Sequence, residues 1–329
     1  MLEKYLQGYS LTKIAYEYYR GEYSPKTVNL AVIEASKYVE RLIGIFTKLI
    51  GQGHEFKTSP AIAIDLTNPP FNPLGKKDLY PTIFMVCDAR LPRLPYNFQS
   101  YPVWPSDNEL LEVIEEFALL SRRYNKTKIK QVTLDNGVQL IRILPDILDK
   151  FPGALPQISI PHTKRYIFKM LPINNVTDPE VKSLRLIIRN ALNTILSYIS
   201  DPDRMRRWVI RLQRVNDIGD DQVEKVLSNI MDMADLLTNY AKNGIRIKTT
   251  NQCEGIYSIL EERIDAMRGF KSIESLRYVT NAFLAYRLFQ KFVSSRYREY
   301  KDKRPIDLCF FPEPRGVWAD YCFIEAFWY

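Results

Sequence analysis

Apolar residues recur at a spacing near 3.6 residues from Leu30 to Leu49, in the N-terminal part of the chain. That period is typical of an α-helix that buries one face. The Gly51-Gln52-Gly53 sequence that follows is a helix-ending signal, because glycine accepts the left-handed conformation common at helix C-termini. We therefore expect residues 1–58 to form a helical N-terminal segment.

The helical period disappears between residues 59 and 105, where nine prolines occur. Two short runs of apolar and β-branched residues, 61–65 and 82–88, are typical of strands. Proline lacks a backbone N–H, so a high proline density disfavours both long helices and central strands. We expect this stretch to be extended chain on the molecular surface, interrupted by the two strands.

The next stretch combines a helix signal with strand signals. Ser106 and Glu109 have the spacing of a capping box, and apolar residues follow at helical spacing. An Asp-Asn-Gly sequence between two apolar runs predicts a β-hairpin over 130–144, because these residues tolerate the positive φ of a tight turn. Runs at 157–160 and 165–170 have the composition of further strands.

From Asp178 onward the pattern is helical again, beginning with Pro179, which suits a first helical turn. The expected elements are helices at 178–199, 203–215, 223–240, 254–268 and 272–300, with a lone strand at 245–249. The predicted fold class is α+β, with a helical N-terminal segment, a central mixed region of short strands and a β-hairpin, and a mostly helical C-terminal half. The expected boundaries are 1–58 for the helical segment, 59–175 for the proline-rich mixed region, 176–303 for a helical domain and 304–329 for an aromatic arm.

Composition places the chain among ordinary globular proteins: 46% of its 329 residues are hydrophobic and 26% are charged. The sequence contains no apolar run long enough for a membrane span and no secretory signal, so we expect a protein that is not secreted and has no membrane partner. A cytoplasmic location, or one inside a virion, fits this. The cysteines are far apart and predict free, buried thiols rather than a zinc site: Cys87, Cys253, Cys309 and Cys322.

A row of arginines is the sharpest charge pattern. The four residues lie three or four positions apart and span only about 80° of a helix: Arg204, Arg207, Arg211 and Arg214. Such a row could bind the phosphates of a nucleic acid, together with the basic residues Lys164, Arg165 and Lys169. Alternatively, the arginines belong to a solvated helix and pair with Asp217, Asp220, Asp221 and Glu224, or they form a protein interface. The net charge of +8 is spread along the chain, so it does not decide between these possibilities.

Residues 8–35 resemble the skeleton of a helix-turn-helix in the spacing of Ser10, Ala15 and Val28. The connection between the two helices is longer than in the compact form, and Tyr18 lies where the turn is expected. Two packed helices without a role in DNA binding fit the same pattern.

Asp65 and Asp88 each end a strand-like run, as do aspartates that hold Mg²⁺ in phosphoryl-transfer enzymes. No spacing places a third acidic residue beside them, and a turn-capping role explains Asp65 equally well. No glycine-rich phosphate loop or nucleophile motif occurs, so the sequence predicts no catalytic residue, no metal ligand set and no cofactor. A metal-dependent phosphoryl-transfer enzyme remains an alternative.

The last twenty residues contain eight aromatic side chains, far above the average of 12% for the chain. Aromatic anchors behind a proline-broken segment are typical of a docking arm, although such a segment can also complete its own core. The residues expected to contact a partner are Trp318, Phe323, Phe327, Trp328 and Tyr329. The leading hypothesis is a structural or assembly protein of a large complex such as a virion-like particle, with self-assembly or protein partners; nucleic-acid binding is the first alternative.

Overall fold

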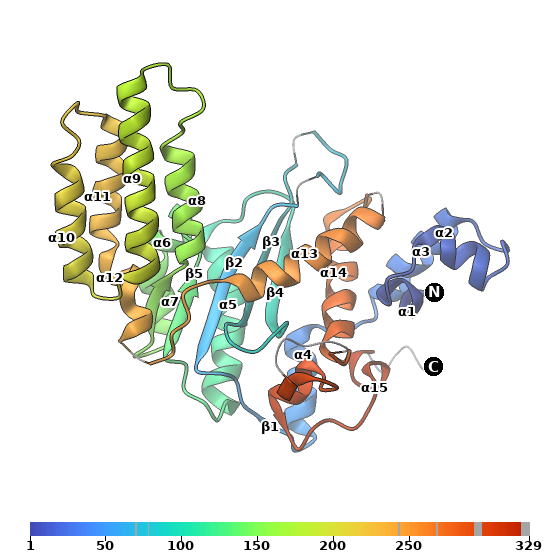
Figure 1. The fold of residues 1–329 in the computed structure, drawn as a ribbon. Helices are drawn as coiled ribbons and strands as arrows, with labels where there is room; N and C mark the ends of the chain where they lie inside the picture. The colour runs from blue at the N-terminus through green and yellow to red at the C-terminus, as the bar shows by residue number, and fades with distance from the viewer. Residues whose placement is uncertain (70, 78, 243, 268, 293–297, 324–329) are drawn as a thin grey trace. The chain divides into compact units, whose positions relative to one another are not determined.

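The computed structural model describes residues 1–69, 71–77, 79–242, 244–267, 269–292 and 298–323. It has an α+β fold and a mostly helical C-terminal half, as the sequence predicts. The chain divides into two compact units (Figure 1). Unit 1 comprises Met1–Lys128 and Asn251–Tyr329, and unit 2 comprises Ile129–Thr250. Among the described residues, no helix combines the length and apolar character needed to cross a bilayer.

Unit 1 is built on three antiparallel strands, with β3 in the middle: β2 (Ala61–Thr67), β3 (Thr82–Asp88) and β4 (Pro95–Tyr101). Both strands predicted in the proline-rich stretch are confirmed. The expectation that the rest of this stretch is extended chain on the surface is wrong for residues 95–101, which form the third strand, β4, and are buried apart from the half-buried Gln99. Proline is tolerated because Pro95 is the first residue of β4, where a missing N–H is least costly.

Unit 1 also contains helices, some of which pack on these strands. The helices are α1 (Leu2–Leu6), α2 (Leu11–Lys13), the π-helical η1 (Ile14–Tyr18), α3 (Pro25–Ser36), α4 (Leu42–Gly51), α5 (Asp107–Tyr124), α13 (Asn251–Ala266), α14 (Ile273–Leu288) and α15 (Trp318–Cys322). Short 3₁₀ turns are η3 (Arg298–Tyr300) and η4 (Pro305–Leu308). Tyr96 stacks on Phe117 of α5, whereas Cys87 contacts Cys253 of α13. The Tyr96 hydroxyl bonds Asp88, which follows Cys87 directly and so lies on the other side of β3. The strands are therefore sandwiched between α5 and α13, which explains why the middle strand, β3, is buried along its whole length.

The N-terminal helical segment is confirmed, but its central helix is interrupted. The continuous period from Leu30 to Leu49 predicts one helix, whereas α3 ends at Ser36 and α4 begins at Leu42. The link between them is held by Val39, which forms an antiparallel bridge with Phe323. This long-range pairing overrides the local helical pattern.

The segment 304–323 packs within unit 1. Its strand β7 (Phe310–Phe311) pairs antiparallel with β1 (Glu55–Phe56). Phe310 is buried beside Phe46 and Phe56, with ring centroids 5.8 and 5.3 Å away. The described part of the aromatic arm thus contributes to the core of its own unit.

Unit 2 contains two parallel strands and a set of helices. The strands are β5 (Gln131–Leu134) and β6 (Leu155–Ile158), and the helices are α6 (Val138–Arg142), α7 (Leu144–Lys150), α8 (Ile160–Met170), α9 (Pro179–Tyr198), α10 (Pro202–Gln213), α11 (Asp221–Asp232), α12 (Ala234–Thr238) and the 3₁₀ turn η2 (Asn239–Ala241). The predicted hairpin over 130–144 is wrong, since its second half is helical. Parallel strands cannot be joined by a tight turn, and α6 and α7 supply the crossover from β5 to β6.

Two further strand predictions in unit 2 are wrong. Residues 165–170 belong to α8, where Thr163 and Ile167 form a buried helical stripe. Residues 245–249 form no strand. The strand expected at 157–160 is displaced by two residues into β6, and the helices expected at 178–199 and 203–215 correspond to α9 and α10.

Candidate functional site

The predicted arginine row lies on the exposed side of α10. Asp201 caps the helix by accepting a hydrogen bond from the Arg204 backbone N–H at 2.6 Å, and Pro202 occupies the first turn. The opposite side carries the buried stripe Met205, Val209 and Leu212. Helical geometry therefore directs the arginines outward; we call Arg204, Arg207, Arg211 and Arg214 the arginine face.

The arginine face is not neutralised by acidic neighbours. In the described part of the chain, none of its four guanidinium groups forms a salt bridge. Arg206, on the same helix but outside the arginine face, instead bonds Asp203 and Asp235. Hydrogen bonding from Arg206 lowers the pKa of the Asp235 carboxyl. On α10, Arg206 is therefore paired with carboxylates, whereas the four residues of the arginine face have no carboxylate partner in the described part of the chain.

The alternative interpretation pairs the arginines with four nearby acidic residues, and the structure does not show this pairing in the described part of the chain. Asp220 binds Arg185 of α9 at 2.6 Å. Burial alone would raise the pKa of the Asp220 carboxyl, but hydrogen bonds from Arg185 and from two backbone amides outweigh it and lower the pKa. No salt bridge joins Asp217, Asp221 or Glu224 to the arginine face among the described residues.

An aromatic ring accompanies these charges. The Arg211 guanidinium lies 4.8 Å from the ring centroid of Trp208, which is 39% exposed. A guanidinium over an indole ring is a favourable cation–π arrangement. In such an arrangement the arginines provide charge for phosphates, and the exposed aromatic ring provides a flat surface for bases.

The other predicted basic residues lie on a different helix. Lys164 and Arg165 belong to α8, which packs on α9 and α11. Lys164 donates to Ser197 Oγ at 2.7 Å, and burial lowers its pKa, with a further contribution from Lys248. The Arg165 guanidinium lies 3.5 Å from His162 Nε2. These two residues are therefore engaged locally and do not extend the arginine face along α10.

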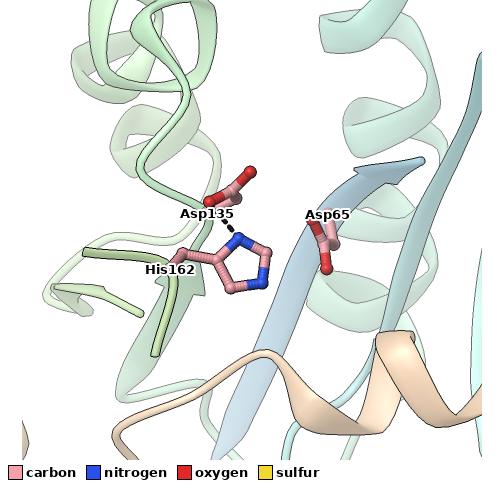
Figure 2. Close-up of side chains that lie close together, drawn as sticks. All are labelled: Asp65, Asp135 and His162. Atoms are coloured by element: carbon pink, nitrogen blue, oxygen red, sulfur yellow. Dashed lines mark hydrogen bonds and ion pairs between the residues drawn. The ribbon is translucent and has the colours of Figure 1, made fainter. Parts of the chain in front are cut away.

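Unit 2 also contains an aspartate–histidine pair that the sequence did not reveal. Asp135 directly follows β5, and His162 lies in the first turn of α8. Figure 2 shows His162 Nδ1 bonded to Asp135 Oδ1. A histidine held in this way through Nδ1 presents Nε2 for a metal ion or a proton. Thr250 Oγ1 lies 3.5 Å from that Nε2.

The two aspartates predicted from strand ends do not lie together. In the β2–β3 register Ile62 is opposite Asp88, whereas Asp65 is opposite Met85. Three residues along a strand amount to about 10 Å and reverse the direction of the side chain. Asp65 and Asp88 therefore face opposite sides of the strands and cannot bind one ion together.

Asp88 is a structural residue. Its buried carboxylate accepts hydrogen bonds from the Ser59 amide and hydroxyl, the backbone amides of Arg90 and Leu91, and the Tyr96 hydroxyl, all between 2.6 and 2.9 Å. Five donors saturate the carboxylate. It fixes the turn that follows β3 and has no capacity left for a ligand.

Asp65 faces α13, the helix that carries Glu254 in its first turn. The adjacent Cys253 contacts the Ala63 carbonyl, two residues before Asp65 on the same face of β2. Burial raises the pKa of the Cys253 thiol well above its usual value, and the charges of Cys87, Asp65 and Glu254 raise it further. Asp65 and Glu254 are thus two carboxylate-bearing residues that act on the same thiol in unit 1, and Glu254 was missed because it is remote in sequence.

The two packed helices expected within residues 8–35 are present in unit 1. Helix α2, η1 and α3 pack on one another, with Ala15 and Val28 fully buried where the helices cross. The connecting turn uses positive φ at Arg20 and Gly21. Whether this helix pair contacts DNA stays a prediction.

The predicted partner contacts fall into two groups. Trp318 is buried, with its ring 5.3 Å from Tyr286, and Phe323 is half-buried, with its ring 5.1 Å from Trp318. Both therefore pack within unit 1. Phe327, Trp328 and Tyr329 lie outside the described residues, and their contact with a partner stays a prediction.

Comparison with protein-family models gives no match, and no curated protein matches the sequence.

Proposed function

We propose that this chain binds nucleic acid through the arginine face of α10 and carries out metal-dependent phosphoryl transfer. The observation that carries the proposal is the arginine face itself, whose four guanidinium groups lack a carboxylate partner in the described part of the chain. Guanidinium groups bind phosphate oxygens in a two-pronged geometry, and a row of them follows a phosphate backbone. Trp208 adds an exposed ring on which a base can stack.

The first experiment measures the affinity for mixed-sequence duplex DNA as a function of salt concentration. Each phosphate neutralised contributes about 0.9 to the slope of log K against log salt concentration. The variant R207A/R211A should therefore bind more weakly and show a slope that is about 1.8 less steep. An unchanged slope would remove the arginine face from the interface.

A matched control separates this effect from the general charge of the protein. Lys182 of α9 and Lys225 of α11 are exposed residues of the same unit. The variant K182A/K225A removes the same charge and should leave the slope closer to that of the unmodified chain. If both double variants reduce the slope of log K against log salt concentration by the same amount, binding depends on net charge and not on α10.

The phosphoryl-transfer part rests on two sets of side chains, one in each unit. Asp65 and Glu254 supply carboxylate oxygens in unit 1, and Asp135 with His162 supplies a carboxylate and an imidazole in unit 2. Carboxylate oxygens suit Mg²⁺ and Mn²⁺, and such ions stabilise the charge that develops when water attacks a phosphodiester. His162 can accept the proton of that water while Asp135 holds its ring in place.

The second experiment measures cleavage of DNA with Mg²⁺ or Mn²⁺ in three single variants, D65N, E254Q and D135N. Each variant should lower the metal-dependent rate by about 100-fold, the upper end of the range for disturbing groups around a metal ion. Asp149 of α7 is exposed, and D149N is the matched control that should cleave normally. Full activity in D65N and D135N would contradict the proposal.

Stability measurements give an independent reading of metal binding. A cation that binds only the folded protein raises its melting temperature in proportion to the logarithm of its concentration. We expect this increase with Mn²⁺ in the unmodified chain and a smaller one in D65N and D135N. The assembly hypothesis from the sequence stays a prediction, but the described part of the aromatic arm lends it less support because it packs within unit 1.

A further inference from the structure

Unit 1 contains a cleft whose lining includes neither Asp65 and Glu254 nor Asp135 and His162. It has a volume of about 590 Å³ and lies among the α3–α4 link, β4, α5 and α14. That volume falls in the range of small-molecule sites, which are about 300–1,000 Å³. Phe98, Tyr101 and Tyr278 supply aromatic walls. The cleft is therefore large enough and has enough apolar surface to hold the body of a small ligand.

Most charged side chains in the cleft already have partners. Arg41 forms two hydrogen bonds with Glu116, at 3.2 and 2.7 Å. Glu109 belongs to the capping box of Ser106, and Lys37 bonds Glu34 at 2.6 Å. These groups define the walls and leave little capacity for a ligand.

Three further residues of the cleft carry polar atoms that have no partner in the described part of the chain. Glu112 on α5 and Arg277 on α14 form no hydrogen bond or salt bridge in the described part of the chain. Asn281 lies one turn beyond Arg277, and its amide donates to the Val39 and Glu40 carbonyls at 3.0 and 2.9 Å. That fixes the side chain, which is 5% exposed, while its Oδ1 has no partner among the described residues.

The remaining groups define the ligand by their chemistry. Glu112 and Asn281 Oδ1 are acceptors, so they suit an ammonium group, whereas Arg277 suits a carboxylate. Asn281 Oδ1 and Arg277 Nε are buried and have no partner in the described part of the chain, so a ligand that satisfies them gains energy on binding. Glu112 is exposed and contributes its negative charge. We propose that this cleft binds a free α-amino acid as a zwitterion, with Glu112 recognising the ammonium group, Arg277 the carboxylate and the aromatic walls the side chain.

The test uses the full chain and the twenty L-amino acids, first by thermal shift and then by calorimetry. The amino acid that binds best should lose at least about tenfold in affinity when its amine is acetylated or its carboxylate is converted to an amide. An absence of binding by every amino acid at millimolar concentration would overturn the proposal.

Two variants assign the contacts. E112Q should bind the free and acetylated forms alike, and R277Q should bind the free and amidated forms alike. Glu224 of α11 is exposed, and E224Q should retain both discriminations. Circular dichroism confirms that each variant is folded. If E112Q and R277Q still discriminate as the unmodified chain does, the amino acid binds elsewhere and the assignment is wrong.

Discussion

At the scale of single residues, strand register separates two aspartates that look alike in the sequence. Asp65 and Asp88 have the same sequence signature, an aspartate near the end of a buried strand. The Asp88 carboxylate accepts hydrogen bonds from five donors of its own unit. Asp65 faces α13 and Glu254 instead. The sequence identified both residues as candidates, but only the register of β2 on β3 shows that they belong to different faces.

The Asp220–Arg185 pair gives a pH-dependent prediction. The pKa of Asp220 is lowered in the folded protein, so its charge contributes stability above the unfolded pKa of about 3.9, and that contribution is lost as the pH falls through the lower folded value. D220N keeps the helix-capping geometry but removes the charge. We expect it to lower the free energy of unfolding by about 2 kcal/mol at pH 7, and by progressively less below about pH 4.

Urea denaturation at neutral and acidic pH measures this difference. Asp217 is exposed and forms no salt bridge among the described residues, so D217N is the matched control and should change stability little at either pH. A loss in D220N that is equal at pH 7 and pH 3 would show that the charge of Asp220 is not what stabilises the pair.

At the scale of elements, α15 tests whether the aromatic segment belongs to the core. Trp318 is buried against Tyr286 of α14. W318A should therefore lower the free energy of unfolding by about 3 kcal/mol, since removing a buried ring leaves a cavity. The neighbouring Val317 is 63% exposed, and V317A is the control. Denaturant unfolding measures both; a stable W318A that changes only the oligomeric state would favour a docking role.

Local signals in the sequence predicted elements well and their connections poorly. The capping box of Ser106 and Glu109 and the strand at 82–88 are where the pattern placed them. The hairpin over 130–144 failed because β5 pairs in parallel with β6, and parallel pairing requires a crossover that no turn residue specifies. The hydrophobic pattern does not reveal the helix break after Ser36. Val39, in the link that follows, pairs with Phe323, which comes from the other end of the chain.

At the scale of the whole molecule, the division into units is not readable from the sequence. Unit 1 joins residues 1–128 to 251–329, so α13 and α14 pack on strands that precede them by more than a hundred residues. Hydrophobic periodicity reports which face of an element is buried, not which element buries it. The arginine face could be predicted because it lies on one helix; Glu254 and the partner of Asp135 could not, because the fold brings them into place from distant segments.

The discontinuous unit 1 leads to a prediction about truncation. A chain ending at residue 303 lacks β7 and α15, and so loses the strand that pairs with β1 and the burial of Phe310 and Trp318. Losing two buried aromatic side chains costs about 3–5 kcal/mol each, comparable with the whole stability of a typical domain. We expect the truncated chain to lose the cooperative unfolding of unit 1 instead of becoming a folded monomer. Light scattering on a sizing column together with thermal unfolding decides this: a folded, monomeric 1–303 chain derived from an oligomeric full chain would restore the assembly hypothesis.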